Sequence, residues 1–324
     1  MLKNFIKSNI TISSLLIISL IIIINNFFRF FRNNSAYEFD PWLSNYQGGF
    51  VRRGIPGEIF YQINSFSGLH LGWLTFIFVS FLYIFFYFNF FKIIQNIKID
   101  KLFAFIILSP LSFYFPILNS KASGHKEILF LFFLSLLFLI IQKINKKKAI
   151  KIIILICIFV ALSYEVLIFY FIYLIIPFIF YYNFKNFSDL IKSLLPILAV
   201  CLGLLILNYY FSGTNKHTLE ICDSVEQYVN TDCKKVGKIA DLGLALDGHE
   251  SQKSNWNYGE TSLYPAYFII YGVGFILGFL PLLILYKKIT INKLVANRIR
   301  SNVFLTLFFM FLFSIPVFYL GADW

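Results

Sequence analysis

Long apolar runs separated by short polar segments are the feature that most restricts the fold of this chain. Several of these runs exceed the roughly 18 apolar residues that cross a bilayer as one helix. Hydrophobic residues fill 59% of the 324 positions, and 42 residues are Phe, which a soluble protein of this length does not need. The sequence therefore predicts an all-α polytopic membrane protein.

We predict about nine transmembrane helices. The first run follows Lys3 and Lys7 like a signal sequence, but no small-residue cleavage site follows it, so we expect it to stay as the first helix. The expected spans cover about 11–28, 71–94, 102–118, 128–142, two short helices within 152–182, 190–210, 263–286 and 302–320. The chain then divides into a membrane part over 1–210 with an outer loop at 29–70, a small periplasmic cap over 211–262 with a helix near 220–246, and a last membrane part over 263–324.

The apolar region 152–182 is the ambiguous one. As a single helix of 31 residues it would be about 46 Å long, whereas the hydrocarbon core is about 30 Å thick. Glu165 lies in its middle, and a carboxylate at the bilayer centre costs at least about 2.5 kcal/mol. A tight hairpin of two short helices joined near Tyr164 and Glu165 would bring this carboxylate close to water.

The distribution of charge supports the hairpin and gives the orientation. With nine spans and a cytoplasmic N-terminus, the cytoplasmic segments hold 17 of the 28 Lys and Arg residues but 2 of the 16 Asp and Glu residues, as the positive-inside rule requires. The net charge of +12 therefore reflects membrane topology, and we expect no nucleic-acid partner, since no soluble basic domain is present. We predict a multi-pass membrane protein with a cytoplasmic N-terminus.

The stretch 37–58 is the most polar and glycine-marked segment of the first two hundred residues. It carries Glu38, Asp40, Arg52, Arg53 and Glu58 among several glycines. Adjacent arginines bracketed by glycines present two guanidinium forks to a phosphate with little obstruction, and an upstream carboxylate such as Asp40 can accept a proton. The alternative interpretation is a membrane-edge loop whose arginines meet lipid headgroups.

Other polar elements reach the same outer face in this topology. Lys121, His125, Lys126 and Glu127 open the helix predicted over 128–142, where an anion would be favoured, although a plain interfacial loop fits equally well. Glu165 is either a functional intramembrane carboxylate or the ion-pair partner of an arginine, and these two roles are compatible. The cap carries Trp256 and Tyr258, which suit sugar rings, but it also fits a plain connecting segment.

The cysteines and the absence of known catalytic motifs narrow the range of possible functions. Cys157 and Cys201 lie in apolar helices and are expected to be small core residues. Cys222 and Cys233 lie in the outer segment and are either a disulfide or two free thiols. Their spacing fits no common zinc pattern, and the chain has no Walker, Rossmann, HExxH or GxSxG motif. We therefore expect no metal and no cofactor, and neither an ATP-driven pump nor a standard hydrolase.

The stretch DPWLSNYQGGFVRRGIPGE resembles the first outer loop of Wzy-type O-antigen or capsule repeat-unit polymerases. The shared pattern is an acidic residue followed by NY-x-GGFVRRG-[LI]-x-GE. In this sequence its charged positions are Asp40, Arg52, Arg53 and Glu58. Three further elements are similar: a G-[RH]-KE element at Gly124, His125, Lys126 and Glu127, a [HY]E pair at Tyr164 and Glu165, and an acidic-Trp pair at Asp323 and Trp324. In that family we expect Gly-Arg-Trp and another helix to follow this pair, so the resemblance implies a truncated C-terminus.

The resemblance implies a glycosyltransferase with a GT-C-like architecture that polymerises undecaprenyl-diphosphate-linked oligosaccharides in the periplasm without nucleotide. Its partners would be these lipid-linked glycans, the bilayer and a chain-length regulator. Asp40 or Glu165 would act as the base, whereas Arg52, Arg53, Glu58, His125, Lys126, Glu127, Asp323 and Trp324 would line the diphosphate and substrate site. The alternatives are a flippase or transporter for a lipid-linked glycan, a transferase that uses polyprenyl-phosphate sugars, and a membrane assembly subunit without catalysis.

Overall fold

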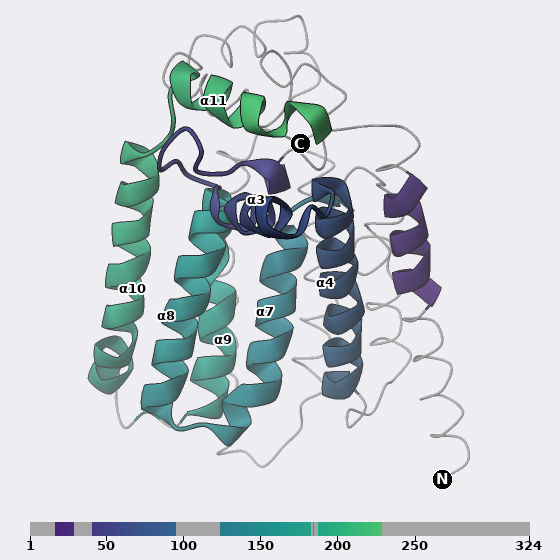
Figure 1. Cartoon of the computed structure of the whole chain (residues 1–324). Helices are drawn as coiled ribbons and strands as arrows, with labels where there is room; N and C mark the ends of the chain where they lie inside the picture. Colours follow the sequence, from purple (N-terminus) through teal and green to yellow (C-terminus); the bar gives the residue numbers. More distant parts are fainter. Residues whose placement is uncertain (1–16, 29–40, 95–123, 183, 185–186, 229–324) are drawn as a thin grey trace, which may run out of the picture.

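A computed structural model describes residues 17–28, 41–94, 124–182, 184 and 187–228 of this chain (Figure 1). Within these ranges every regular element is a helix, in agreement with the predicted all-α class. The elements are an N-terminal helix (Ile17–Phe28), α3 (Ile55–Ser67), α4 (Leu71–Ile94), α7 (Glu127–Ile140), η2 (Ile141–Lys143), α8 (Lys146–Ser163), η3 (Glu165–Tyr170), α9 (Phe171–Tyr181), α10 (Phe187–Tyr210), α11 (Asn215–Val225) and η4 (Glu226–Tyr228).

Two of the described helices are long and apolar enough to cross a membrane. They are the stretches Leu71–Ile93 within α4 and Ser188–Tyr210 within α10. Both match spans predicted at 71–94 and 190–210, because a long apolar run satisfies its backbone groups most simply as one helix. The spans predicted at 102–118, 263–286 and 302–320 lie outside the described residues, so the total of nine stays a prediction.

The long helices α4, α7, α8, α9 and α10 stand side by side, and α3 and α11 lie across one end of them (Figure 1). One core joins the N-terminal helix, α3, α4, α11 and the start of α7. A second core fills the space between α7, α8, α9 and α10. Within the bundle, the amide of Asn89 in α4 donates to the hydroxyl of Ser135 in α7 at 3.2 Å. Because the two side chains satisfy each other, both can be buried.

The hairpin predicted within 152–182 is present, although α8 begins earlier, at Lys146. The backbone of Tyr164 is extended, with φ −163° and ψ 107°, which ends α8 immediately before Glu165. After η3 the chain runs back as α9, and the hydroxyl of Tyr182 lies 2.7 Å from the carbonyl oxygen of Ile144, before α8 begins. The two helices are therefore antiparallel, and Glu165 lies at their closed end.

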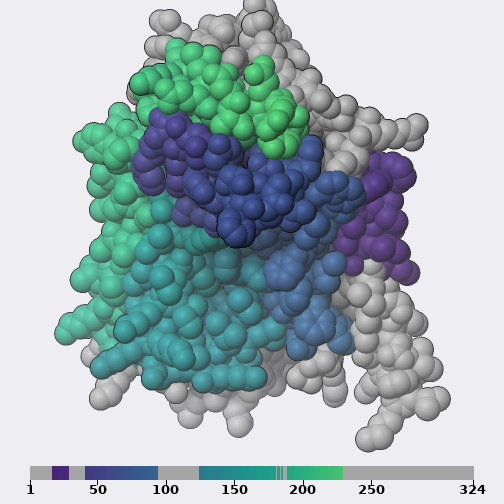
Figure 2. Space-filling model, in the orientation of Figure 1, coloured from purple at the N-terminus to yellow at the C-terminus, as the bar shows by residue number. Residues whose placement is uncertain are grey.

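The cap contributes α11 to the described residues. We expected a helix near 220–246, but α11 begins earlier, at Asn215, because Thr214 and His217 form a capping box at its N-terminus. The α-helix ends at Val225 and continues as η4, and residues 229–246 lie outside the described ranges. In the space-filling view, α3 and the loop before it lie between α11 and the helix bundle (Figure 2).

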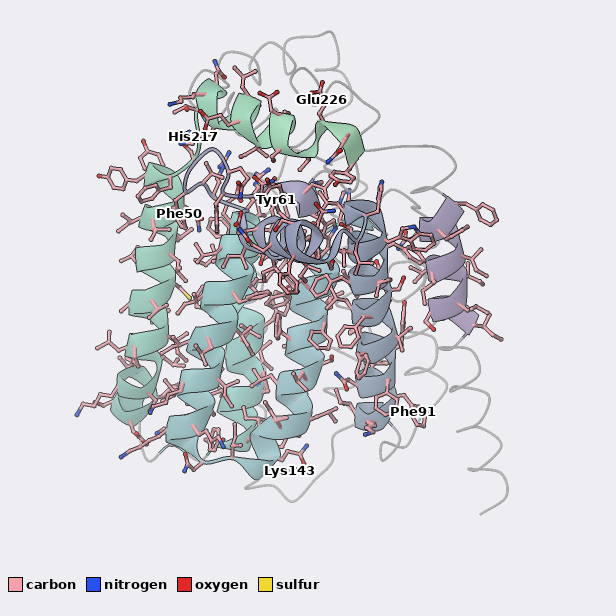
Figure 3. The ribbon with its side chains drawn as sticks, viewed as in Figure 1. Phe50, Tyr61, Phe91, Lys143, His217 and Glu226 are labelled. Atoms are coloured by element: carbon pink, nitrogen blue, oxygen red, sulfur yellow. The ribbon has the colours of Figure 1, made fainter. Side chains whose placement is uncertain are left out.

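The arrangement predicts which segments share a side of the membrane. The amide of Asn45 donates to the hydroxyl of Ser224 at 2.8 Å, so the arginine loop and α11 lie at one end, whereas Lys143 lies at the other end, as Figure 3 shows. Reporter fusions at Gly49 and Ser224 should therefore both signal outside, and a fusion at Lys147 should signal inside. A cytoplasmic signal at Ser224 would contradict this orientation.

Candidate functional site

The loop that carries the two arginines is fixed at both ends by buried polar contacts. The indole of Trp42 is fully buried and donates to the carbonyl oxygen of Gly124 at 2.7 Å. Glu58, in the first turn of α3, accepts the backbone N–H of Tyr46 at 2.9 Å. Gly48 allows the loop to touch α11, because a Cβ at this position would lie 2.9 Å from the backbone oxygen of His217. The loop is therefore a folded element and not a loose connection.

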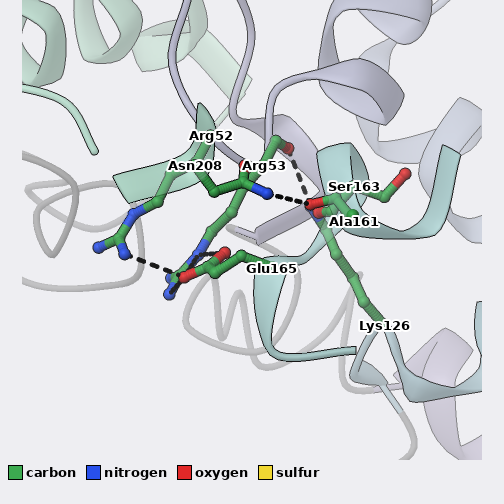
Figure 4. Close-up of polar contacts among 7 residues, drawn as sticks. All are labelled: Arg52, Arg53, Lys126, Ala161, Ser163, Glu165 and Asn208. Carbon is green, nitrogen blue, oxygen red and sulfur yellow. Dashed lines mark hydrogen bonds and ion pairs between the residues drawn. The ribbon is translucent and has the colours of Figure 1, made fainter. Parts of the chain in front are cut away.

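Arg52 and Arg53 both bind Glu165, at the closed end of the α8–α9 hairpin (Figure 4). Arg53 makes a bidentate contact, with Nε 2.7 Å from Oε2 and Nη2 2.5 Å from Oε1. Nη1 of Arg52 lies 3.1 Å from Oε1 of the same carboxylate. Two guanidinium groups thus face one carboxylate at this end of the bundle.

Arg53 has an unusual backbone conformation. Its φ of +71° lies in the left-handed region, which is uncommon for a residue other than glycine and costs of order 1 kcal/mol or more. The guanidinium also lies over the ring of Tyr164, 5.1 Å from the centroid. The surrounding structure therefore stabilises a strained residue in one orientation toward Glu165.

Lys126 supplies part of that support. Its side chain is 1% exposed, and its ammonium donates to the carbonyl oxygens of Arg53 at 3.1 Å and Ser163 at 2.7 Å. Burial, followed by the neighbouring Arg53 guanidinium, lowers the pKa of Lys126 well below its usual range, whereas Glu165 and Glu127 oppose this shift. Lys126 therefore joins the arginine loop to the last residue of α8, just before the break that precedes Glu165.

Among the described residues, the other predicted site residues form no hydrogen bond or ion pair with Glu165. Glu58 holds the loop, and Nδ1 of His125 lies 3.9 Å from Oε2 of Glu127. Burial and then the charge of Glu58 raise the pKa of Tyr46 to about 12, so its phenol stays neutral near neutral pH.

Several predicted residues lie outside the described ranges. They are Asp40, Asp323, Trp324 and Cys233. Cys222 is disulfide-bonded, and Cys157 and Cys201 are free and buried. Among the described residues no group of three or more His, Cys, Asp or Glu side chains is placed to hold a metal ion.

Two residues of the site were missed at the level of sequence. Trp42 lies under Lys126, whose ammonium is 5.6 Å from the ring centroid. The buried amide of Asn208, in α10, donates to the carbonyl oxygen of Ala161 at 3.4 Å, near the end of α8. The signal for Asn208 was a lone amide in an apolar helix, because a buried amide needs a hydrogen-bond partner.

Comparisons of this chain with protein-family models, with curated proteins and with solved structures found no match. The proposal below therefore draws on the geometry of the site and on the motif of the arginine loop.

Proposed function

We propose that this chain is a membrane glycosyltransferase that polymerises undecaprenyl-diphosphate-linked oligosaccharide repeat units at the periplasmic face. The observation that carries the proposal is the convergence of Arg52 and Arg53 on Glu165 at one end of the helix bundle. This convergence joins two of the motifs on which the resemblance to repeat-unit polymerases depends, although 112 positions separate Arg53 from Glu165.

The proposed reaction needs a cationic site and a base. The bond between the anomeric carbon of the donor glycan and an oxygen of undecaprenyl diphosphate breaks, and a bond forms from that carbon to a hydroxyl oxygen of the acceptor sugar. The hydroxyl proton passes to a carboxylate, and undecaprenyl diphosphate leaves. Because the leaving group carries the developing negative charge, fixed guanidinium groups near its phosphates lower the barrier.

The contacts favour distinct roles for the charged residues. Both oxygens of Glu165 accept N–H groups of Arg53, so we assign Glu165 the role of positioning the guanidinium groups. This leaves Asp40 as our candidate for the base that accepts the hydroxyl proton. Lys126 binds two backbone carbonyls and holds the arginine loop against α8, so we assign it a positioning role as well.

The sharpest test replaces Arg52 with lysine. The Arg52 side chain is 18% exposed and makes one ion contact with Glu165, so lysine keeps the charge but loses the planar fork. In a deletion strain complemented with Arg52→Lys, we expect short glycan chains at normal protein abundance, because loss of one transition-state contact typically costs about 10²- to 10³-fold in rate. Polymer length is read from a gel of extracted glycolipid, and abundance from a blot.

The control is Lys147→Gln, at the opposite end of α8, which should leave polymer length unchanged. Full-length polymer from Arg52→Lys would refute the role of the arginine fork. The deletion strain separates the alternatives, since a polymerase defect leaves single repeat units attached to the acceptor, whereas a flippase defect leaves none.

A further inference from the structure

The helix α3 carries an exposed apolar stripe. Ile59 and Ile63 are 45% and 40% exposed, and Phe66 is 95% exposed. These positions are spaced by four and three residues, so at 3.6 residues per turn they lie on one face of the helix. Within α3 the one ionisable carboxylate is Glu58, which is not part of this stripe.

The remaining faces of α3 are occupied by the protein. Phe60 packs against Phe78 of α4, with ring centroids 5.4 Å apart. Glu58 accepts from the backbone N–H of Tyr46 in the arginine loop, and Asn64 accepts from the hydroxyl of Tyr228 in the cap at 3.2 Å. On a helical projection the mean direction of Glu58 and Asn64 is roughly 180° from the apolar stripe. The stripe therefore faces away from the cap.

The position of α3 along α4 indicates its depth relative to the membrane. Phe78 lies seven positions after Leu71, the first residue of α4, which corresponds to about 10 Å along the helix axis. Because α4 contains a candidate membrane span, α3 lies beside the outer turns of that span. In the space-filling view α3 forms part of the molecular surface beside the bundle (Figure 2).

One side of α4 is also apolar and exposed. Trp73, Ile77, Phe81, Phe85 and Phe88 are exposed at intervals of three or four residues along this helix. An apolar side of a membrane-spanning helix faces lipid, and tryptophan is enriched where such a helix enters the interface. Because α3 packs on α4 through Phe60 and Phe78, it lies beside a helix that has an apolar side of the kind that lipid chains cover.

We propose that α3 is an interfacial helix, and that Ile59, Ile63 and Phe66 insert into the outer leaflet of the bilayer. The polar side of α3 then faces the cap and water, and the buried side faces the bundle. Since α3 begins two residues after Arg53, this contact places Arg52 and Arg53 near the depth of lipid phosphates. That consequence relates to the proposed function, whereas the lipid contact itself does not depend on it.

Photocrosslinking in intact membranes tests the proposal. Full-length variants carry p-benzoylphenylalanine at position 66, at position 63 or, as a control on the polar side, at position 65. After illumination, mass spectrometry of the purified protein should find phospholipid adducts at 66 and 63 and at least tenfold fewer at 65. Because Phe66 and Ser65 are exposed, neither replacement removes a buried contact, and a melting curve of each variant verifies folding.

Other molecules that could cover the apolar stripe would give different crosslinked adducts. A protein adduct at position 66, from a second copy of the chain or from another protein, would overturn the proposal. Adducts with undecaprenyl lipid in place of phospholipid would assign the stripe to the substrate and would also overturn it. Equal phospholipid labelling at positions 65 and 66 would show that α3 has no lipid-facing side, and would overturn the proposal. If phospholipid adducts persist at 66 while the deletion strain still makes full-length polymer, the interfacial helix stands and the proposed function falls.

Discussion

Replacing Glu165 with glutamine should both destabilise the protein and abolish polymer synthesis. The carboxylate is largely buried and faces the guanidinium groups of Arg52 and Arg53. Removing one partner of a buried ion pair costs about 3 kcal/mol or more, because the opposite charge stays buried without compensation. The measurements are the thermal unfolding of purified protein in detergent and the length of polymer in a complemented deletion strain.

Glu58→Gln is the matched control. Glu58 lies at the same end of the bundle, but it accepts hydrogen bonds from neutral groups, namely the backbone N–H of Tyr46 and the amides of Gln47 and Gln62. Loss of such contacts costs about 1 kcal/mol. Equal destabilisation by the two substitutions would contradict the ion pair.

The double variant Arg53→Met with Glu165→Leu separates stability from activity. Well-packed apolar residues often replace a buried ion pair with little loss of stability. We therefore expect the double variant to be more stable than Glu165→Gln, by about 1–3 kcal/mol, and still unable to make polymer. Recovery of polymer in the double variant would refute the catalytic importance of this cluster.

The long apolar helices among the described residues follow closely from the apolar runs, whereas α3 lies within the segment 29–70, which we predicted to be a loop. The run predicted at 71–94 coincides with α4, and the break predicted near Tyr164 is where α8 ends. The first prediction follows because an apolar segment satisfies its backbone hydrogen bonds most simply as a helix. The second follows because burying the carboxylate of Glu165 in a membrane is costly. The position of α11 was less predictable, because its start depends on a local capping box formed by Thr214 and His217.

The details of the site depended on contacts that residue types do not reveal. An ion pair between Glu165 and an arginine was one of two open interpretations. Only the fold shows that both Arg52 and Arg53 bind this carboxylate. Lys126 binds backbone carbonyls, which every residue possesses. Its sequence context fitted an anion site and a plain interfacial loop equally well and did not indicate this role. The left-handed conformation of Arg53 had no sequence signal, since that region is typical of glycine.

Gly57→Ala should unfold or displace the arginine loop, although alanine is the better helix former. Gly57 lies in the first turn of α3, where alanine would favour the helix by about 1 kcal/mol. A Cβ at this position would collide with the backbone carbonyl group of Ser44. Ser44 adjoins the buried Trp42 and Asn45, so its backbone has little room to move. Overpacking of this kind costs about 1–3 kcal/mol, which exceeds the gain in helix propensity.

Gly203→Ala in α10 provides the matched control, because a Cβ there would meet no atom within 4 Å. The same chemical change should therefore raise the melting temperature at Gly203 and lower it at Gly57, with opposite signs in one assay. Limited proteolysis should also cut the Gly57→Ala loop faster than the wild-type loop, while Gly203→Ala leaves the cleavage rate unchanged. If Gly57→Ala were as stable as the wild type, the close approach of α3 to Ser44 would be refuted. The placement of Arg52 and Arg53 beside Glu165 would then lose its main steric support, because α3 begins two residues after Arg53.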